Sequence, residues 1–283
     1  MNTVINCLTH REFACVTLCR FLLATICAVA VTSGVSATFA QGFAAIVSPP
    51  RFELSAKAGD KLRQVVEITN ASAQSAKFYL KTGDWTLDKT GGVLFDDSLA
   101  SGSCRPWVAI ERREIVISGG GKYRFRFEIA APADAPSGEC RFALLIEGDE
   151  QAVKSTNGPS VPVAGRVAVI VYVMVGGAAP KLEVVASEVT TIGGFALPQL
   201  QVRNSGNAHG RLDGFLSGTD ASGKKLEFSV STLPILPGET RAISLSVNRG
   251  DGEAPIKIVY PVTIRGNLEW GEKSTPFEQR FAP

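Results

Sequence analysis

The residue types that most often carry enzyme chemistry are scarce in this sequence of 283 residues. It contains two histidines, His10 and His209, and no G-x-S-x-G motif that would present a nucleophilic serine. Catalysis needs a nucleophile, a base and an electrostatic stabiliser in one place. His209 lies in the turn-like stretch NSGNAHGRL, where we expect it to be exposed to solvent. The sequence therefore predicts a protein that is not an enzyme, with no cofactor and no small-molecule substrate.

The positions of the cysteines predict one covalent cross-link. Four of the six cysteines lie before residue 40: Cys7, Cys15, Cys19 and Cys27. The remaining two, Cys104 and Cys140, are predicted to form a disulfide, because a cysteine pair in an exported protein most often does so. A two-ligand metal site is the alternative, although structural zinc usually takes four ligands. No metal site is predicted.

The first 40 residues have the pattern of a secretory signal peptide. Arg11 and Arg20 precede an apolar segment at residues 21–31, and small residues follow up to Ala40. The apolar segment is shorter than the roughly 20 residues that a membrane span needs, so an uncleaved anchor is the less favoured alternative. We expect cleavage after Ala40 or Ala37, export to the periplasm, and a mature protein that is not integral to the membrane.

The overall composition limits the class of protein and the kinds of partner that we expect. The chain is 45% hydrophobic and 20% charged, which is typical of a globular protein. Its formal net charge of +2 provides no strong electrostatic attraction for nucleic acid, so no nucleic-acid partner is expected.

Beyond residue 40 the sequence favours β-strands. In the stretch KYRFRFEI, apolar side chains occupy every second position and charged side chains the positions between, as in a strand that is buried on one face. The apolar face is predicted to contain Tyr123, Phe125, Phe127 and Ile129. No amphipathic helix is evident, and the best candidate for a helical turn is at residues 134–137.

Many short strands separated by turn residues indicate β-sandwiches. The small residues and proline of GGAAPKL predict a hinge. We therefore expect an all-β fold of two immunoglobulin-like β-sandwich domains in tandem after the signal peptide. The predicted boundaries are 1–40 for the signal peptide, 41–176 for the N-terminal domain and 177–283 for the C-terminal domain.

The two halves also echo each other. A strand ends at Asn70 in EITNAS, and another ends at Asn204 in QVRNSG. An internal duplication would produce this pattern, and so would the general preference for asparagine in turns. Both explanations stay open at this point.

The stretch GRVAVIVYVMVGG, residues 165–177, contains an unbroken apolar run of nine residues. A helix of that length is about 14 Å long and cannot cross a bilayer, and the high valine content favours a strand. A strand that is apolar on both faces needs cover on both. The second domain could cover its outer face, or the strand could lie at an edge and share its side chains with a partner by strand addition.

Together these features resemble the PapD-like periplasmic chaperones of pilus and fimbrial assembly. The resemblance extends over nearly all of the chain beyond residue 40. It is carried by SPPRFEL, VVEITNAS, GDW, the stretch from CRPW to LIEG, the valine run, VRNSGNAHGRLDGFL and LPILPGETR. The resemblance implies a chaperone that donates a β-strand to incompletely folded pilus or fimbrial subunits, with an outer-membrane usher as a further candidate partner. The alternative is an exported structural or adhesion protein made of two immunoglobulin-like modules without chaperone activity.

The resemblance also implies binding residues. Arg51 stands where the family has a basic residue that holds the C-terminal carboxylate of a subunit, and a guanidinium suits that task. The family's second anchor, a lysine, would fall at or near Val169, where this sequence has no lysine. Arg166 is the nearest cation and becomes the candidate second anchor. Val167, Val169 and Val171 are the side chains expected to be donated to the partner.

Overall fold

The computed structural model describes residues 43–149, 151–154, 160–249 and 256–283. The expected signal peptide and its cleavage site lie outside these ranges. The described chain consists of β-strands and one short 3₁₀ helix at Arg105–Trp107, and the helical turn expected at 134–137 is not helical. Within the described ranges, no helix has the length and apolar content that a membrane crossing requires.

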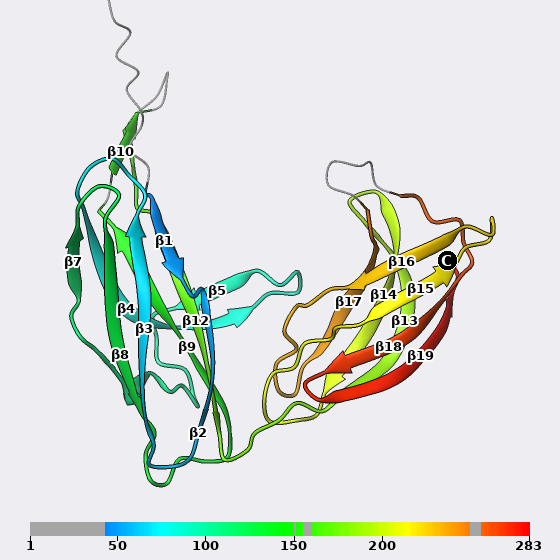
Figure 1. Ribbon diagram of the computed structural model, residues 1–283, viewed down its shortest axis with the longest axis horizontal. Coiled ribbons are helices and arrows are strands. Elements are labelled where there is room, and N and C mark those ends of the chain that lie inside the picture. The colour runs from blue at the N-terminus through cyan, green and yellow to red at the C-terminus, as the bar shows by residue number, and fades with distance from the viewer. Residues whose placement is uncertain (1–42, 150, 155–159, 250–255) are drawn as a thin grey trace, which may run out of the picture. The chain divides into compact units, whose positions relative to one another are not determined.

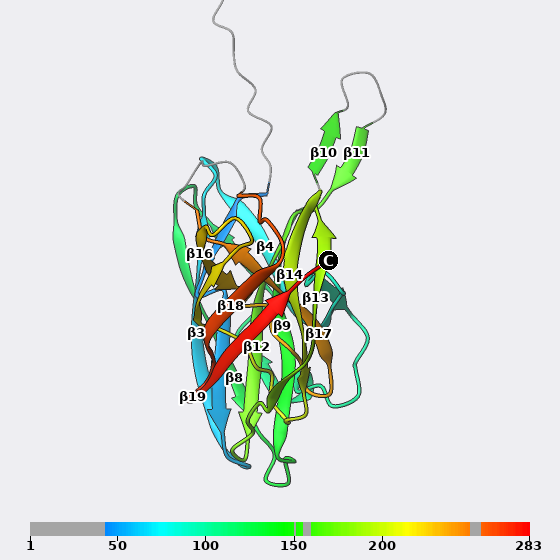
Figure 2. The same ribbon diagram turned by 90° about the vertical axis from the view of Figure 1, so that its right-hand side faces the viewer.

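The first sandwich is built from two sheets (Figure 1). Its strands are β1 (Ala45–Ser48), β2 (Arg51–Ala56), β3 (Lys61–Asn70), β4 (Ala76–Leu87), β5 (Val93–Asp96), β6 (Val108–Ile110), β7 (Glu114–Ile117), β8 (Lys122–Ala130), β9 (Gly138–Gly148) and β12 (Arg166–Val175). One sheet has the order β1-β3-β8-β6, and the other has the order β2-β12-β9-β4-β5, with β7 paired to β4. Between β9 and β12, strands β10 (Gln151–Lys154) and β11 (Ser160–Val163) form a separate hairpin that extends beyond the sheets (Figure 2).

Strand β8 has the alternation predicted from the sequence. Phe125, Phe127 and Ile129 are buried in the core between the two sheets, and Tyr123 is half-buried against it. The basic residues between them are exposed. The prediction of a strand buried on one face is confirmed.

The predicted disulfide is also present. Cys104 and Cys140 are bonded, with their Cα atoms 5.5 Å apart. Cys140 lies on β9, and Cys104 lies in the segment that leads through the 3₁₀ helix to β6. Because β9 and β6 belong to different sheets, the bond ties the two layers of the sandwich together.

The second sandwich is formed by one continuous path of strands that folds over its own core. Its strands are β13 (Leu182–Ile192), β14 (Phe195–Asn204), β15 (Phe215–Thr219), β16 (Lys225–Val230), β17 (Thr240–Val247), β18 (Val262–Trp270) and β19 (Lys273–Phe281). The path runs β13-β14-β17-β16-β15-β18-β19, so β13 and β19 are its two ends. Large apolar side chains such as Leu200, Phe228 and Ile243 fill the interior.

The predicted all-β fold of two sandwiches is confirmed. Both belong to one compact unit, Gly42–Pro283. Strand β12 ends at Val175 and β13 begins at Leu182. The exact boundary at residues 176 and 177 stays a prediction.

Strand β12 is the valine run of the sequence. It pairs antiparallel with β9 along its whole length, and its residues Ile170–Val175 also pair parallel with β2. Val169, Val171, Val173 and Val175 are buried in the core of the first sandwich.

The opposite face of β12 is apolar for a different reason. Tyr172 is buried in a second, smaller cluster with Trp85, Ala143 and Leu145, and Ile170 packs against that cluster. The run is therefore apolar on both faces because one face lies in the main core and the other lies in this outer cluster.

Candidate functional site

Arg51 lines a cavity of about 410 Å³. It is the first residue of β2 and stands opposite Ile170 of β12. The other residues that line the cavity belong to the second sandwich and include Arg211, Asp213, Thr232, Glu269 and Trp270. The cation that shares this cavity with Arg51 is therefore Arg211, which the sequence analysis did not single out.

The two guanidinium groups face the same carboxylate. Arg51 Nε lies 2.8 Å from Glu53 Oε1, and Arg211 Nε lies 3.8 Å from the same oxygen. Burial lowers the pKa of the Arg211 guanidinium, and the nearby positive charge of Arg51 lowers it further. Arginine nevertheless stays protonated at neutral pH, so two like charges lie close together. A second carboxylate would relieve their repulsion.

Arg211 also donates two hydrogen bonds on its other side. Its Nη1 donates to the carbonyl oxygen of Thr232 at 2.7 Å, and its Nη2 donates to the hydroxyl of Tyr172 at 3.4 Å. Burial raises the pKa of Tyr172 to about 12, so this hydroxyl is neutral at physiological pH. Arg211 Nε is buried and makes no hydrogen bond within the described part of the chain. The nearest acceptor to this N–H is the Glu53 carboxylate, 3.8 Å away.

A buried contact between Glu139 and His209 positions the loop that carries Arg211. The Glu139 side chain is fully buried, and its Oε2 accepts a hydrogen bond from the backbone N–H of His209 at 2.9 Å and contacts His209 Nδ1. The His209 ring stacks on Tyr172 with 3.7 Å between ring centroids. His209 is 6% exposed, so its predicted solvent exposure is wrong, because the turn packs against β9 and β12.

The start of β12 has one open flank. The Gly165 carbonyl accepts a hydrogen bond from Gly148 next to β9, and the Ile170 N–H donates to the Pro50 carbonyl on the other side. Backbone groups alternate in direction along a strand, so the polar groups of Arg166 and Ala168 point away from β9. β2 begins only opposite Ile170. β1 passes close to β12 but pairs with β3, so no strand of the described chain is hydrogen-bonded to this flank.

The valines predicted to be donated are used by the chain itself. Val169 and Val171 are 0% exposed in the core, and Val167 is half-buried against it. A partner could reach these side chains only if β12 left its own sandwich. Their donation to a partner stays a prediction. The parts of β12 that its own sandwich leaves unpaired are the backbone flank and the residues at its end.

Arg166 does not line the cavity of Arg51. It forms an ion pair with Glu147 and lies over the ring of Phe95, 6.0 Å from the ring centroid. It also lies four positions along β12 from Ile170, which is roughly 13 Å in a strand. The structure brings Arg51 together with Arg211 and keeps Arg166 at the other end of the open flank.

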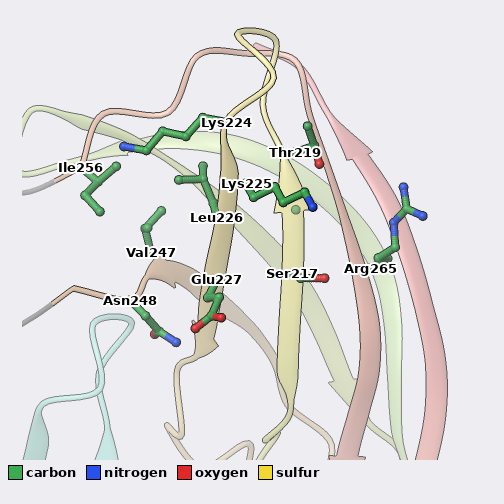
Figure 3. Close-up of a pocket in the computed structure, with 11 residues that line it drawn as sticks. Ser217, Thr219, Lys224, Lys225, Leu226, Glu227, Val247, Asn248, Ile256 and Arg265 are labelled. Carbon is green, nitrogen blue, oxygen red and sulfur yellow. The ribbon is translucent and has the colours of Figure 1, made fainter.

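A larger groove, of about 660 Å³, lies on the second sandwich (Figure 3). It is lined by Lys224, Lys225 and Arg265 among others, yet Lys224 and Lys225 extend to opposite sides of β16 and Arg265 points away from both. Its rim includes Ile256, which borders residues outside the described ranges. Because the three cations do not converge, we do not assign this groove as the site.

No protein-family model matches the sequence, and no curated protein matches it either. Among solved structures, the chain is similar to the class 5 fimbrial chaperone CfaA, with 14% identity and a TM-score of 0.43 over 84% of this chain and 99% of that chain. A chain from the CsuC–CsuE chaperone–subunit complex of Acinetobacter baumannii gives the same four values. A chain from the complex of the Salmonella enterica SafA pilin with the SafB chaperone has 12% identity and a TM-score of 0.43. The match covers 86% of this chain and 98% of that chain.

Fold and site define the chain as an all-β protein of two tandem sandwiches. Its distinguishing feature is an open strand flank that ends beside a pair of guanidinium groups, Arg51 and Arg211.

Proposed function

We propose that this protein is an exported chaperone that binds the C-terminal segment of an incompletely folded pilus or fimbrial subunit. The open flank of β12 supports this function most directly, because it stops at the position where Arg51 stands. A partner strand that runs parallel to β12 along residues 166–169 would bring its carboxyl end to Arg51 and Arg211. The usher as a second partner and the periplasmic location stay predictions.

The two parts of the site make different contributions. The unpaired N–H and C=O groups of Arg166 and Ala168 would hydrogen-bond to the backbone of the added strand, which is how edge strands bind extended peptides. The guanidinium groups of Arg51 and Arg211 would hold the terminal carboxylate by charge-assisted hydrogen bonds. The carboxylate fixes the register of the strand, since it can lie only at the end of the flank.

A direct test uses a synthetic peptide of twelve residues that alternates valine and threonine, carries two lysines at its N-terminus and is made with a free or an amidated C-terminus. The protein, purified from the periplasm, is expected to bind the free acid about 10-fold or more tightly than the amide, because the amide loses charge-assisted hydrogen bonds. Arg51→Ala and Arg211→Ala are expected to remove that difference, measured by fluorescence anisotropy.

The control is Arg124→Ala, since Arg124 is exposed on β8 and far along the chain from the cavity. It should leave both affinities unchanged. Equal binding of acid and amide to the unmodified protein would contradict the carboxylate anchor.

One observation favours the structural or adhesion alternative. Both faces of the valine run are covered, by the core on one side and by the cluster around Tyr172 on the other. A strand that serves only its own domain would look the same. Failure of every peptide to bind would favour this alternative.

A further inference from the structure

A second cavity, of about 380 Å³, lies inside the mouth of the second sandwich. It opens at the seam where β13 and β19, the two ends of the strand path, approach each other without pairing in the described chain. Its walls are mainly apolar and include Leu182, Val184, Val202, Leu268, Pro276 and Phe277. We call it the seam pocket.

The seam pocket adjoins the cavity that contains the two guanidinium groups. Leu212 and Trp270 line both. The two adjoining cavities therefore differ in chemistry. One contains the guanidinium groups of Arg51 and Arg211 beside the carboxylates of Asp213 and Glu269, and the other has mainly apolar walls. A ligand that matches both cavities has a carboxylate next to an apolar group.

Trp270, which lines both cavities, carries a buried donor. Its Nε1 is buried and has no hydrogen-bond acceptor within the described part of the chain. A buried donor without a partner is costly, and a ligand oxygen would satisfy it. The carboxylate or the last carbonyl of a bound chain end supplies such an oxygen.

The two strands beside the seam favour binding of a side chain in the pocket over pairing with an added strand. The register of β13 with β14 shifts between Val184 and Ala186, which marks a bulge beside the pocket. On β19, Pro276 has no N–H to offer a neighbouring strand. Bulges and prolines both protect edge strands from pairing. What remains accessible is the pocket between the strands.

We propose that the seam pocket binds the apolar side chain of the last residue of the client, while Arg51 and Arg211 hold that residue's carboxylate. The assignment rests on the function proposed above and makes it more specific: the chaperone selects clients whose chain ends in a large apolar residue. A fatty acid has the same chemistry of a carboxylate beside an apolar group, so the test includes one.

The test compares two peptides that share the valine–threonine sequence and a free carboxylate and differ in the last residue, phenylalanine or glycine. The unmodified protein is expected to bind the phenylalanine peptide about 10-fold or more tightly, because burial of a large apolar side chain has an effect of that size. Dodecanoate is added as a competitor in a third arm.

Two variants block the pocket. Thr275 is exposed on β19 and lines the pocket. The variant Thr275→Trp is expected to fill the pocket with a large side chain, and tryptophan is well tolerated in β-strands. Val184→Lys places a charge at the mouth, where Val184 is 37% exposed. Each variant is expected to reduce the preference for phenylalanine to less than 2-fold. Thr191→Trp is the matched control, an exposed threonine on the other edge strand, and it should keep the preference.

The outcomes distinguish failure of the seam-pocket proposal from failure of the proposed chaperone function. Carboxylate-dependent binding with equal affinity for both peptides would overturn the seam pocket and leave the chaperone function standing. Absence of binding for every peptide would overturn both. A third outcome is that dodecanoate displaces the bound peptide, that Thr275→Trp abolishes this displacement, and that the protein shows no preference between the two peptides. This outcome would identify a lipid site and would also overturn the proposal.

Discussion

At the scale of single residues, two asparagines share three of their hydrogen-bond contacts in the two sandwiches. Asn70, at the end of β3, accepts a hydrogen bond from the N–H of Ser72 at 3.0 Å. Its Nδ2 donates to the carbonyl of Gln74 at 2.7 Å and to the carbonyl of Ile117 at 3.0 Å. One side chain thus closes the turn after its strand and fixes the turn to a distant segment.

Asn204, at the end of β14, repeats this arrangement. It accepts from the N–H of Gly206 at 2.9 Å and donates to the carbonyls of Ala208 and Ile235, both at 2.8 Å. In each case the acceptor bond reaches two residues ahead and one donor bond reaches four residues ahead. The echo seen in the sequence therefore has a shared structural cause, whether it arose by duplication or twice independently.

Replacement of either asparagine should be costly. Asn70→Ala and Asn204→Ala each leave buried carbonyl and amide groups without partners, and we expect each to lower the free energy of unfolding by about 3 kcal/mol. Urea unfolding measures this. Asn267→Ala, at an exposed position on β18, is the control and should change stability by less than about 0.5 kcal/mol. Losses no greater than the control's would show that these side chains do not hold the turns.

The residues around Arg211 could not have been predicted from the sequence. His209 has the neighbours of an exposed turn residue, and its buried partner Glu139 is 70 positions away. Arg51 stood out because it matched a family position, whereas Arg211 in AHGRLDG has no local signal. Such sites depend on which strands the fold brings together, and this information is not local.

At the scale of elements, the sequence predicted that the valine run is a strand with two covered faces but not which residues lie on each face. Alternation of polar and apolar residues normally identifies the buried face. A strand that is apolar at every position lacks that signal. In the structure Val169 and Val171 lie in the core and Tyr172 lies on the outer face, so the valines expected to be donated are buried in the chain's own sandwich.

A proline at Ala168 tests the open flank directly. The N–H of Ala168 points to the flank and not to β9, so Ala168→Pro removes a bond to an added strand while keeping the β9 ladder. We expect peptide affinity to fall about 5- to 10-fold, the effect of one lost hydrogen bond with some steric cost. Fluorescence anisotropy with the free-acid peptide measures it.

Ala168→Val is the matched control, because it keeps the N–H and adds a side chain of similar size. It should bind the peptide as the unmodified protein does. An equal loss of affinity in both variants would mean that side-chain crowding, and not the missing N–H, is responsible.

At the scale of the whole molecule, the sequence predicted the all-β class, the two sandwiches and the disulfide. Each of these has a local or compositional signal: alternating strands, a small-residue hinge and the two cysteines beyond residue 40. It did not predict that β2 pairs parallel with β12 or that β13 and β19 leave a seam. Strand order depends on contacts between distant segments, which propensity and periodicity do not encode.

The disulfide gives a prediction at this scale. It closes a loop with a sequence separation of 36 and joins the two sheets of the first sandwich. The double variant Cys104→Ala and Cys140→Ala is expected to lose about 3 kcal/mol of stability, since the unfolded chain regains the freedom that the cross-link removes. Because Cys140 lies on β9, which supports the open flank of β12, the peptide should also bind the variant less tightly once the first sandwich begins to unfold.

Urea unfolding in a Trp270→Phe background follows the first sandwich alone, because the two remaining tryptophans, Trp85 and Trp107, lie in it. The unfolding midpoint of the variant that lacks Cys104 and Cys140 should fall and should not respond to dithiothreitol. The midpoint of the bridged protein should fall toward the same value when dithiothreitol is present throughout unfolding. A bridged protein whose midpoint matches that of the variant would show that the bond contributes nothing to stability, and the two sheets would then be held by their packed core alone.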